Sequence, residues 1–135
     1  MWKRHQRSLA RVLPSDPQTY PNGICLETEK GFYFLRSGKR YRLPTQRILD
    51  SWKFPLIVET TESAVSKYRV VAKLGFRDGS LLYNVADGKI YLISENKRRH
   101  IISPDALELL GISPNDAVKV SDYEINLQEL GESIG

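Results

Sequence analysis

Cysteine and histidine are scarce in this chain of 135 residues, and their scarcity excludes several classes of chemistry. Cys25 is the only cysteine, so an internal disulfide and a thiolate metal cluster are both excluded. The two histidines, His5 and His100, fall short of known metal-ligand spacings, and no motif brings either of them to Cys25 for nucleophilic catalysis. A glycine-rich phosphate loop is also absent. We therefore expect no enzymatic activity, no metal ion, no cofactor and no small-molecule substrate.

Long apolar runs are missing as well. No segment approaches the roughly 20 apolar residues that cross a bilayer, so we expect no membrane insertion. The charged start of the chain is not followed by an apolar stretch, so no secretory signal is expected. The content of 41% hydrophobic and 27% charged residues is that of an ordinary globular protein, and the length suits one domain or two very small units.

Charge is distributed unevenly along the chain, although the net charge of +4 is modest. The first dozen residues contain four cations and no acid, whereas residues 105–132 contain seven acids and only one cation, Lys119. A basic arm of this kind seeks an acidic partner, and the alternative is a solvated terminus. We expect residues 1–20 to form a basic N-terminal arm.

An internal repeat organises the rest of the sequence. With a shift of 58 positions, residues 32–43 match residues 90–101: apolar positions coincide, and Lys39-Arg40 falls on Lys97-Arg98. Each block follows an Asn-Gly or Asp-Gly turn signal, and each precedes a further matching segment, 45–52 in the first copy and 103–110 in the second. Such a repeat is usually one supersecondary unit.

Local signals predict the elements of the second copy. Residues 89–93 and 98–102 predict two strands joined by a polar reversal, which gives a hairpin. Ser103 is a candidate helix N-cap with Pro104 at the first helical position, and Gly111 is a stop signal. The short helix between them has a wide apolar face that we expect to pack inward, formed by Ala106, Leu107, Leu109 and Leu110.

Three further segments complete the prediction. Val118 and Val120 alternate as a short strand, and residues 121–124 have capping-box spacing. Residues 64–76 are rich in β-branched side chains and predict a strand that links the two copies. The expected fold is therefore α+β and β-rich, with two tandem, diverged β-hairpin plus short-helix units that share a small core. We place the first unit with its linking strand at 21–76 and the second, with its acidic tail, at 77–135.

Both hairpins carry cations next to tyrosines. The first copy has Arg36, Lys39, Arg40 and Arg42, and the second has Lys97, Arg98, Arg99 and His100. Cations and aromatic rings on a β-surface can bind a phosphate backbone, an acidic glycan or a protein. The alternative is a solvated hairpin tip, but both copies retain Lys-Arg while other positions have diverged, which favours a contact role, mostly toward protein.

The second copy resembles a known short tandem repeat. Its run from Tyr91-Leu92-Ile93 through Asn96-Lys97-Arg98-Arg99 to Ser103-Pro104, followed by Leu110-Gly111 and Val120-Ser121, is similar to repeats of envelope-associated bacterial proteins and of bacteriophage virion proteins. The resemblance covers residues 77–130 well and 21–60 poorly. The first copy departs from it with Arg42-Leu43-Pro44-Thr45 in place of His-Ile-Ile-Ser-Pro and with Lys53 in place of the glycine. The repeat family carries no catalytic residues to transfer.

The resemblance implies a non-enzymatic role. We expect a minor structural protein of a bacteriophage virion, in the tail or head-to-tail region, which is made in the host cytoplasm and docks onto other virion proteins. The alternative is an envelope- or glycan-binding module that uses the basic and aromatic hairpins, and the third candidate is nucleic-acid binding, against which the acidic tail argues. The residues expected to contact a partner are Trp2, Lys3, Arg4, Arg7, Arg11, Arg40, Arg42, Arg98 and Arg99.

Overall fold

The computed structural model of the chain describes residues 20–135, which form two compact units. Unit 1 ends at Leu74 and unit 2 runs from Gly75 to Gly135, so the division lies two residues before the one expected from the sequence. Both units are β-rich with few short helices, which confirms the predicted fold class. Within residues 20–135, none of the helices has the length and apolar character that crossing a membrane requires.

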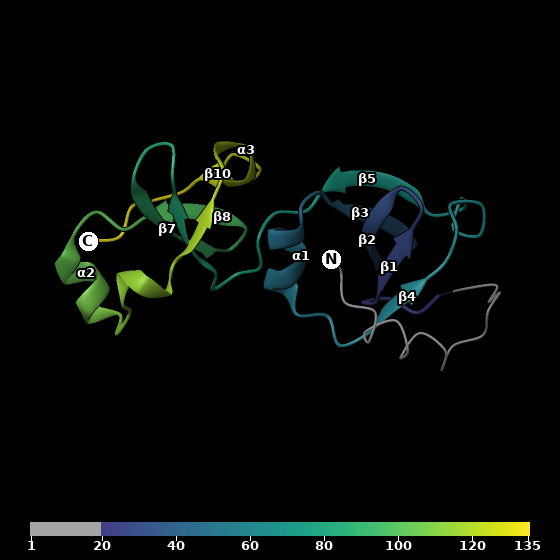
Figure 1. Cartoon of the computed structure of the whole chain (residues 1–135), viewed down its shortest axis with the longest axis horizontal. Coiled ribbons are helices and arrows are strands. Elements are labelled where there is room, and N and C mark those ends of the chain that lie inside the picture. The colour runs from purple at the N-terminus through teal and green to yellow at the C-terminus, as the bar shows by residue number, and fades with distance from the viewer. Residues whose placement is uncertain (1–19) are drawn as a thin grey trace. The chain divides into compact units, whose positions relative to one another are not determined.

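Unit 1 is a five-stranded sheet with one short helix (Figure 1). The strand order is β4-β1-β2-β3-β5; the three central strands are antiparallel neighbours, and each edge strand is parallel to its neighbour. Its elements are β1 (Cys25–Thr28), β2 (Gly31–Arg36), β3 (Lys39–Leu43), α1 (Gln46–Trp52), β4 (Ile57–Glu59) and β5 (Arg69–Lys73).

Unit 2 repeats this arrangement. Its sheet has the order β9-β6-β7-β8-β10, again with three antiparallel central strands and a parallel strand at each edge. Its elements are β6 (Leu81–Asn84), β7 (Lys89–Ser94), β8 (Lys97–His100), α2 (Pro104–Leu109), the 3-10 helix η2 (Pro114–Asp116), β9 (Val118–Val120), α3 (Asp122–Ile125) and β10 (Glu129–Leu130). The internal repeat of the sequence is thus a repeat of topology.

Equivalent backbone hydrogen bonds extend the pairing of β1 with β2 in unit 1 and of β6 with β7 in unit 2. The backbone N–H of Gly23 donates to Leu35 O at 2.7 Å, and that of Gly79 donates to Ile93 O at 2.7 Å. The tight turn between β2 and β3 has two residues of positive φ, Ser37 and Gly38, and the turn between β7 and β8 has Glu95 and Asn96. Two successive positive φ angles define the hairpin turn that matches strand twist, which explains why these polar residues stand there.

In each unit a buried side chain anchors the segment that precedes the first strand. In unit 1 the backbone N–H of Tyr20 donates to the Tyr68 hydroxyl at 2.9 Å. In unit 2 the backbone N–H of Phe76 donates to Gln128 Oε1 at 3.0 Å, and Gln128 Nε2 donates to Phe76 O at 2.9 Å. Tyr68 and Gln128 each directly precede the last strand of their sheet, so the first and last segments of each unit are fastened to one another.

Helix α2 of unit 2 begins at the predicted cap. Ser103 accepts the N–H of Ala106 and precedes Pro104, as the sequence indicates, and Thr45 caps α1 in the same way. The prediction that four residues of α2 pack inward is only half right. Ala106 and Leu107 are buried, but Leu110 is 45% and Leu109 89% exposed, because α2 ends after six residues and its last turn extends past the core.

The strand predicted at 64–76 is shorter than expected. Only Arg69–Lys73 forms a strand, β5, which belongs to the sheet of unit 1 and whose residues are all exposed. Residues 62–67 form turns instead. The valines that suggested a longer strand divide between these two places: Val65 is fully buried in the core of unit 1, whereas Val70 and Val71 lie on the exposed edge strand.

Hydrophobic clusters lie within each unit. A cluster of unit 1 contains Leu26, Leu35, Val58 and Val65, and a cluster of unit 2 contains Ile101, Ala106 and Leu107. Leu26 and Leu35 have equivalents in Leu82 and Ile93, which are also almost fully buried. Equivalent strands therefore bury equivalent faces.

Candidate docking surfaces

The predicted partner residues fall into two groups. Trp2, Lys3, Arg4, Arg7 and Arg11 lie outside the described residues. The structure places the four hairpin arginines, Arg40, Arg42, Arg98 and Arg99, in contacts with their own unit.

Arg40 is a buried internal anchor of unit 1. Its Nε donates to Tyr68 O at 2.7 Å, and its guanidinium forms an ion pair with Glu62 at 3.0 Å, with the Arg40 and Glu62 side chains 6% and 19% exposed. The guanidinium also lies over the Tyr33 ring at 4.6 Å from its centroid. Burial by itself raises the pKa of Glu62, but hydrogen bonds from Thr28 and Arg40 and the charge of Arg40 outweigh it, so the pKa is lowered.

Arg98 repeats this contact in unit 2. Its Nε donates to Gln128 O at 3.0 Å, and its guanidinium lies 5.4 Å from the centroid of the Tyr91 ring. Arg40 and Arg98 each stand seven residues after the tyrosine that they cover and each reach the carbonyl just before the last strand. We call this contact the arginine lock. The arginine that the two hairpins share therefore makes an internal contact in both copies.

Arg42 and Arg99 also bind their own backbone. Arg42 donates to Lys30 O at 3.0 Å and to the Tyr33 hydroxyl at 3.3 Å, and Arg99 donates to Glu132 O at 2.8 Å. Both side chains remain partly exposed, so a partner could still reach them. A role for them in partner contact stays a prediction.

The two groups weighed for nucleophilic chemistry have structural surroundings. Cys25 is fully buried in β1, and burial, with a smaller contribution from the charge of Glu27, raises the pKa of its thiol far above the usual value. A thiol held protonated and away from solvent is a poor nucleophile. His100 packs against the Tyr91 ring at 5.6 Å between centroids.

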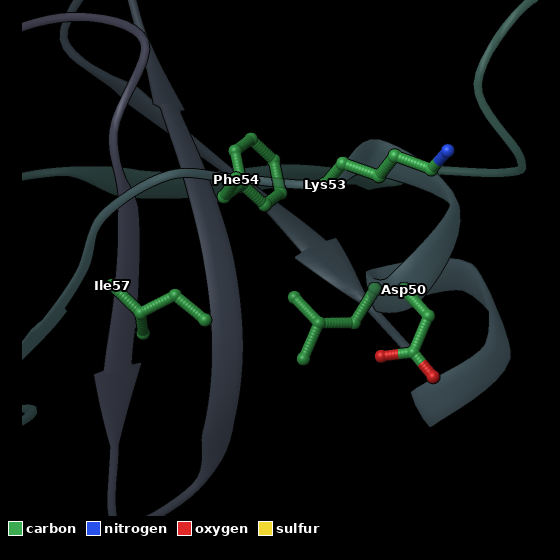
Figure 2. Close-up of a pocket in the computed structure, with 5 residues that line it drawn as sticks. Asp50, Lys53, Phe54 and Ile57 are labelled. Carbon is green, nitrogen blue, oxygen red and sulfur yellow. The ribbon is translucent and has the colours of Figure 1, made fainter. Parts of the chain in front are cut away.

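A pocket lies at the end of α1 in unit 1. It has a volume of about 300 Å³ and is lined by Leu49, Asp50, Lys53, Phe54 and Ile57, which we call the α1 pocket. Figure 2 shows the charged ends of Asp50 and Lys53 on the side away from Ile57. Its lining combines three apolar side chains with two charged ones, which we call the rim.

Three stacked aromatic rings adjoin this pocket. Phe54 stacks on Phe34 at 5.6 Å and on Trp52 at 6.1 Å between ring centroids. Such offset aromatic contacts hold the loop after α1 against β2. The wall that Phe54 contributes to the α1 pocket is therefore fixed in place rather than carried on a loose loop.

Lys53 holds a strained backbone at the rim. Its φ is +52°, where the equivalent residue of unit 2 is Gly111 with φ +70°. An L-residue in this region costs roughly 1–2 kcal/mol, which glycine avoids. Lys53 departs from the repeat pattern, which has a glycine at this position, and the structure places it in the lining of the α1 pocket.

The end of α2 is shaped differently. Leu109 and Leu110, which we call the α2 apex, protrude at the position where unit 1 has Ser51 and the packed Trp52. α2 also carries Asp105 and Glu108 and no cation. At the same place in the repeat, unit 1 has a hollow with both apolar and charged lining, and unit 2 has an apolar projection.

The two units differ in charge as well. Residues 20–74 contain ten Lys and Arg against five Asp and Glu, a net of +5, whereas residues 75–135 contain six against ten, a net of −4. The basic start and the acidic end are visible in the sequence, but only the division at Leu74 shows that each sign belongs to one copy of the fold.

Within residues 20–135, no three His, Cys, Asp or Glu side chains are grouped so as to hold a metal ion. Comparison of the chain with protein-family models, curated proteins and solved structures finds no match.

Proposed function

We propose that this chain is a non-enzymatic docking protein that serves as a minor structural component of a bacteriophage virion, in the tail or head-to-tail region. The observation that carries the proposal is the contrast between the two units. They share topology, hairpin turns, terminal anchors and the arginine lock, yet their exposed surfaces differ in charge and shape.

Shared features of the repeat are internal, so they account for folding. The differing features, the α1 pocket in one unit and the α2 apex in the other, are exposed to a partner. Two unlike surfaces on one small chain suit a protein that bridges two neighbours, because complementary charge and apolar anchors give each surface its own specificity. The resemblance of the second copy to repeats of virion proteins supports a particle as the place of that bridge.

One observation favours a second candidate, glycan binding. The stacked Phe34, Trp52 and Phe54 rings stand beside a pocket with Asp50 and Lys53, and aromatic faces with nearby charged groups can hold a sugar. Three of the five residues that line the α1 pocket, Leu49, Phe54 and Ile57, offer a sugar no hydrogen bond from their side chains, which is why we rank protein docking first.

Mass spectrometry of phage particles purified on a density gradient, from cells that carry the gene, tests the proposal. We expect the chain in the particles at a fixed ratio to the tail proteins. A variant without residues 1–12 is expected to be lost from the particles, because the basic arm would no longer reach its acidic neighbour. A chain found only in the particle-free supernatant would contradict the virion role, and full incorporation of the truncated variant would contradict the role of the arm.

A further inference from the structure

We infer that the chain associates head to tail with a second copy of itself, the α2 apex of one copy entering the α1 pocket of the next. This inference rests on the proposed function in one respect, that the chain acts by docking to protein. It adds the partner and the two surfaces that meet.

The shapes of the two surfaces correspond. Leu109 is 89% exposed, more than any other large hydrophobic residue among those described, and it projects from a helix end. The α1 pocket, at about 300 Å³, has room for an aliphatic side chain and presents Leu49, Phe54 and Ile57 to it. Burial of Leu109 there would remove apolar surface from water on both sides.

The charges of the two surfaces also correspond. Asp105 and Glu108 flank the approach to the α2 apex, and Lys53 stands on the rim of the α1 pocket. Asp50 lies on the same rim, where its Oδ1 accepts a hydrogen bond from the neutral Gln46 amide at 2.9 Å, so the attraction requires that Lys53 rather than Asp50 face the acids of α2. The net charges of +5 and −4 add a longer-range attraction between unlike units and a repulsion between like units.

The backbone at Lys53 gives an independent reason to look at this rim. The chain keeps a lysine at φ +52° where the other copy has glycine at +70°. Strain of this kind is commonly retained where a side chain is needed for function. Here the retained group is the cation that would face the acids of α2.

Contact between a pocket on one unit and a projection on the other is heterologous. Such a contact leaves one free pocket and one free apex on every dimer, so it continues into a ring or an open filament. A ring or short stack suits the symmetric tail or neck of a phage particle.

Sedimentation equilibrium of the full chain tests the inference. At about 100 μM protein, we expect association beyond the monomer in about 0.02 M salt and its weakening in about 0.5 M salt, because the attraction between exposed charges is screened. A chain that is monomeric at both salt concentrations would overturn the inference.

Three changes locate the contact. Leu109→Ser is expected to weaken association about tenfold, whereas the matched control Val85→Ser, at another exposed apolar residue of unit 2, leaves it unchanged. Lys53→Gly removes the cation and the backbone strain together, so it should raise the melting temperature and still weaken association. This opposite pair of effects cannot come from misfolding. Equal weakening by Leu109→Ser and Val85→Ser, or unchanged association in Lys53→Gly, would overturn the assignment.

A charge exchange gives the sharpest readout. Lys53→Glu and Glu108→Lys should each weaken self-association, and a mixture of the two variants should associate again, because the rim and the apex carry opposite charges in both mixed pairings. Failure of the mixture to associate overturns the inference. The inference is also overturned if the wild-type chain is monomeric and the nuclear magnetic resonance signals of its α1 pocket residues shift when an oligosaccharide is added. A monomeric chain found in purified particles refutes self-association alone, and a self-associating chain absent from particles refutes the virion role alone.

Discussion

Arg40→Ala is expected to lower the free energy of unfolding of unit 1 by about 3 kcal/mol. The change leaves the Glu62 carboxylate without its ion pair, the Tyr68 carbonyl without its donor and the Tyr33 ring uncovered. Breaking a buried pair costs this much because the remaining charge stays in a poorly solvated place. Hydrogen exchange followed by mass spectrometry measures the change separately in peptides of each unit.

Arg98→Ala is the matched control for this prediction. Arg98 makes the equivalent backbone contact and covers the equivalent tyrosine, but it is partly exposed, so we expect a loss of only about 1 kcal/mol, in unit 2. Equal losses in the two variants would mean that the Glu62 pair contributes nothing and would contradict the account of the lock.

The ion pair also sets a pH dependence. The pKa of Glu62 is lowered in the folded state from its ordinary 4.5, so its contribution to stability is fully present above that pH and is lost as the pH falls through the folded-state pKa. Glu62→Gln should therefore flatten the acid side of the stability profile of unit 1.

Gln128→Ala is expected to destabilise unit 2 by about 3 kcal/mol, because it leaves two buried backbone groups without partners and opens a cavity. Gln128 binds both the N–H and the carbonyl of Phe76, and its Nε2 also donates to Asn96 Oδ1 at 3.1 Å. Gln46→Ala is the matched control: Gln46 is exposed and makes one side-chain contact, so its loss should stay within about 0.5 kcal/mol.

A second variant separates hydrogen bonding from packing at this position. Gln128→Glu keeps the shape but places a carboxylate in a buried site, where its pKa rises. The protonated acid can still donate to Phe76 O, so this variant should be less stable than wild type at neutral pH and recover part of the difference as the pH falls. Chemical denaturation at pH 7 and pH 5 measures this recovery. If the difference in the free energy of unfolding between variant and wild type is the same at both pH values, burial at this site does not raise the pKa of the introduced carboxylate.

Local signals in the sequence were enough for much of the fold. The turns at Gly23 and Gly79, the cap at Ser103 and the capping box of Ser121 and Glu124 all depend on neighbours within a few residues, and all are present. The repeat itself could be read because β2, β3 and α1 keep a constant offset from β7, β8 and α2.

Long-range features of the fold could not be predicted from the sequence. The edge strands β5 and β10 pair in parallel with β3 and β8 across about 30 residues of chain, and no local pattern specifies such a partner. The hairpin arginines are predicted to contact a partner because both copies retain Lys-Arg, and no local pattern shows that the carbonyl near residue 68 or 128 also brings Arg40 and Arg98 onto their own units. The tyrosine that stands seven residues before the arginine in both copies is the sequence signal for this internal contact.

The surfaces were foreseen only in part. The departure at Lys53 was visible in the sequence, but the α1 pocket beside it depends on how Phe54 stacks after the helix. The sequence predicts Leu109 inside because its cap and stop signals give the ends of the helix but not the point where the last turn leaves the core.

Hydroxyl-radical footprinting of the chain, free and within purified particles, tests the docking account most directly. The account predicts that Leu109 in the α2 apex and Phe54 in the α1 pocket lose reactivity on incorporation, while Tyr33 and Tyr91, covered by the arginine locks in both states, stay unreactive. Unchanged reactivity of Leu109 and Phe54, with protection elsewhere on the units, would contradict the claim that the chain docks through the surfaces that its two copies do not share.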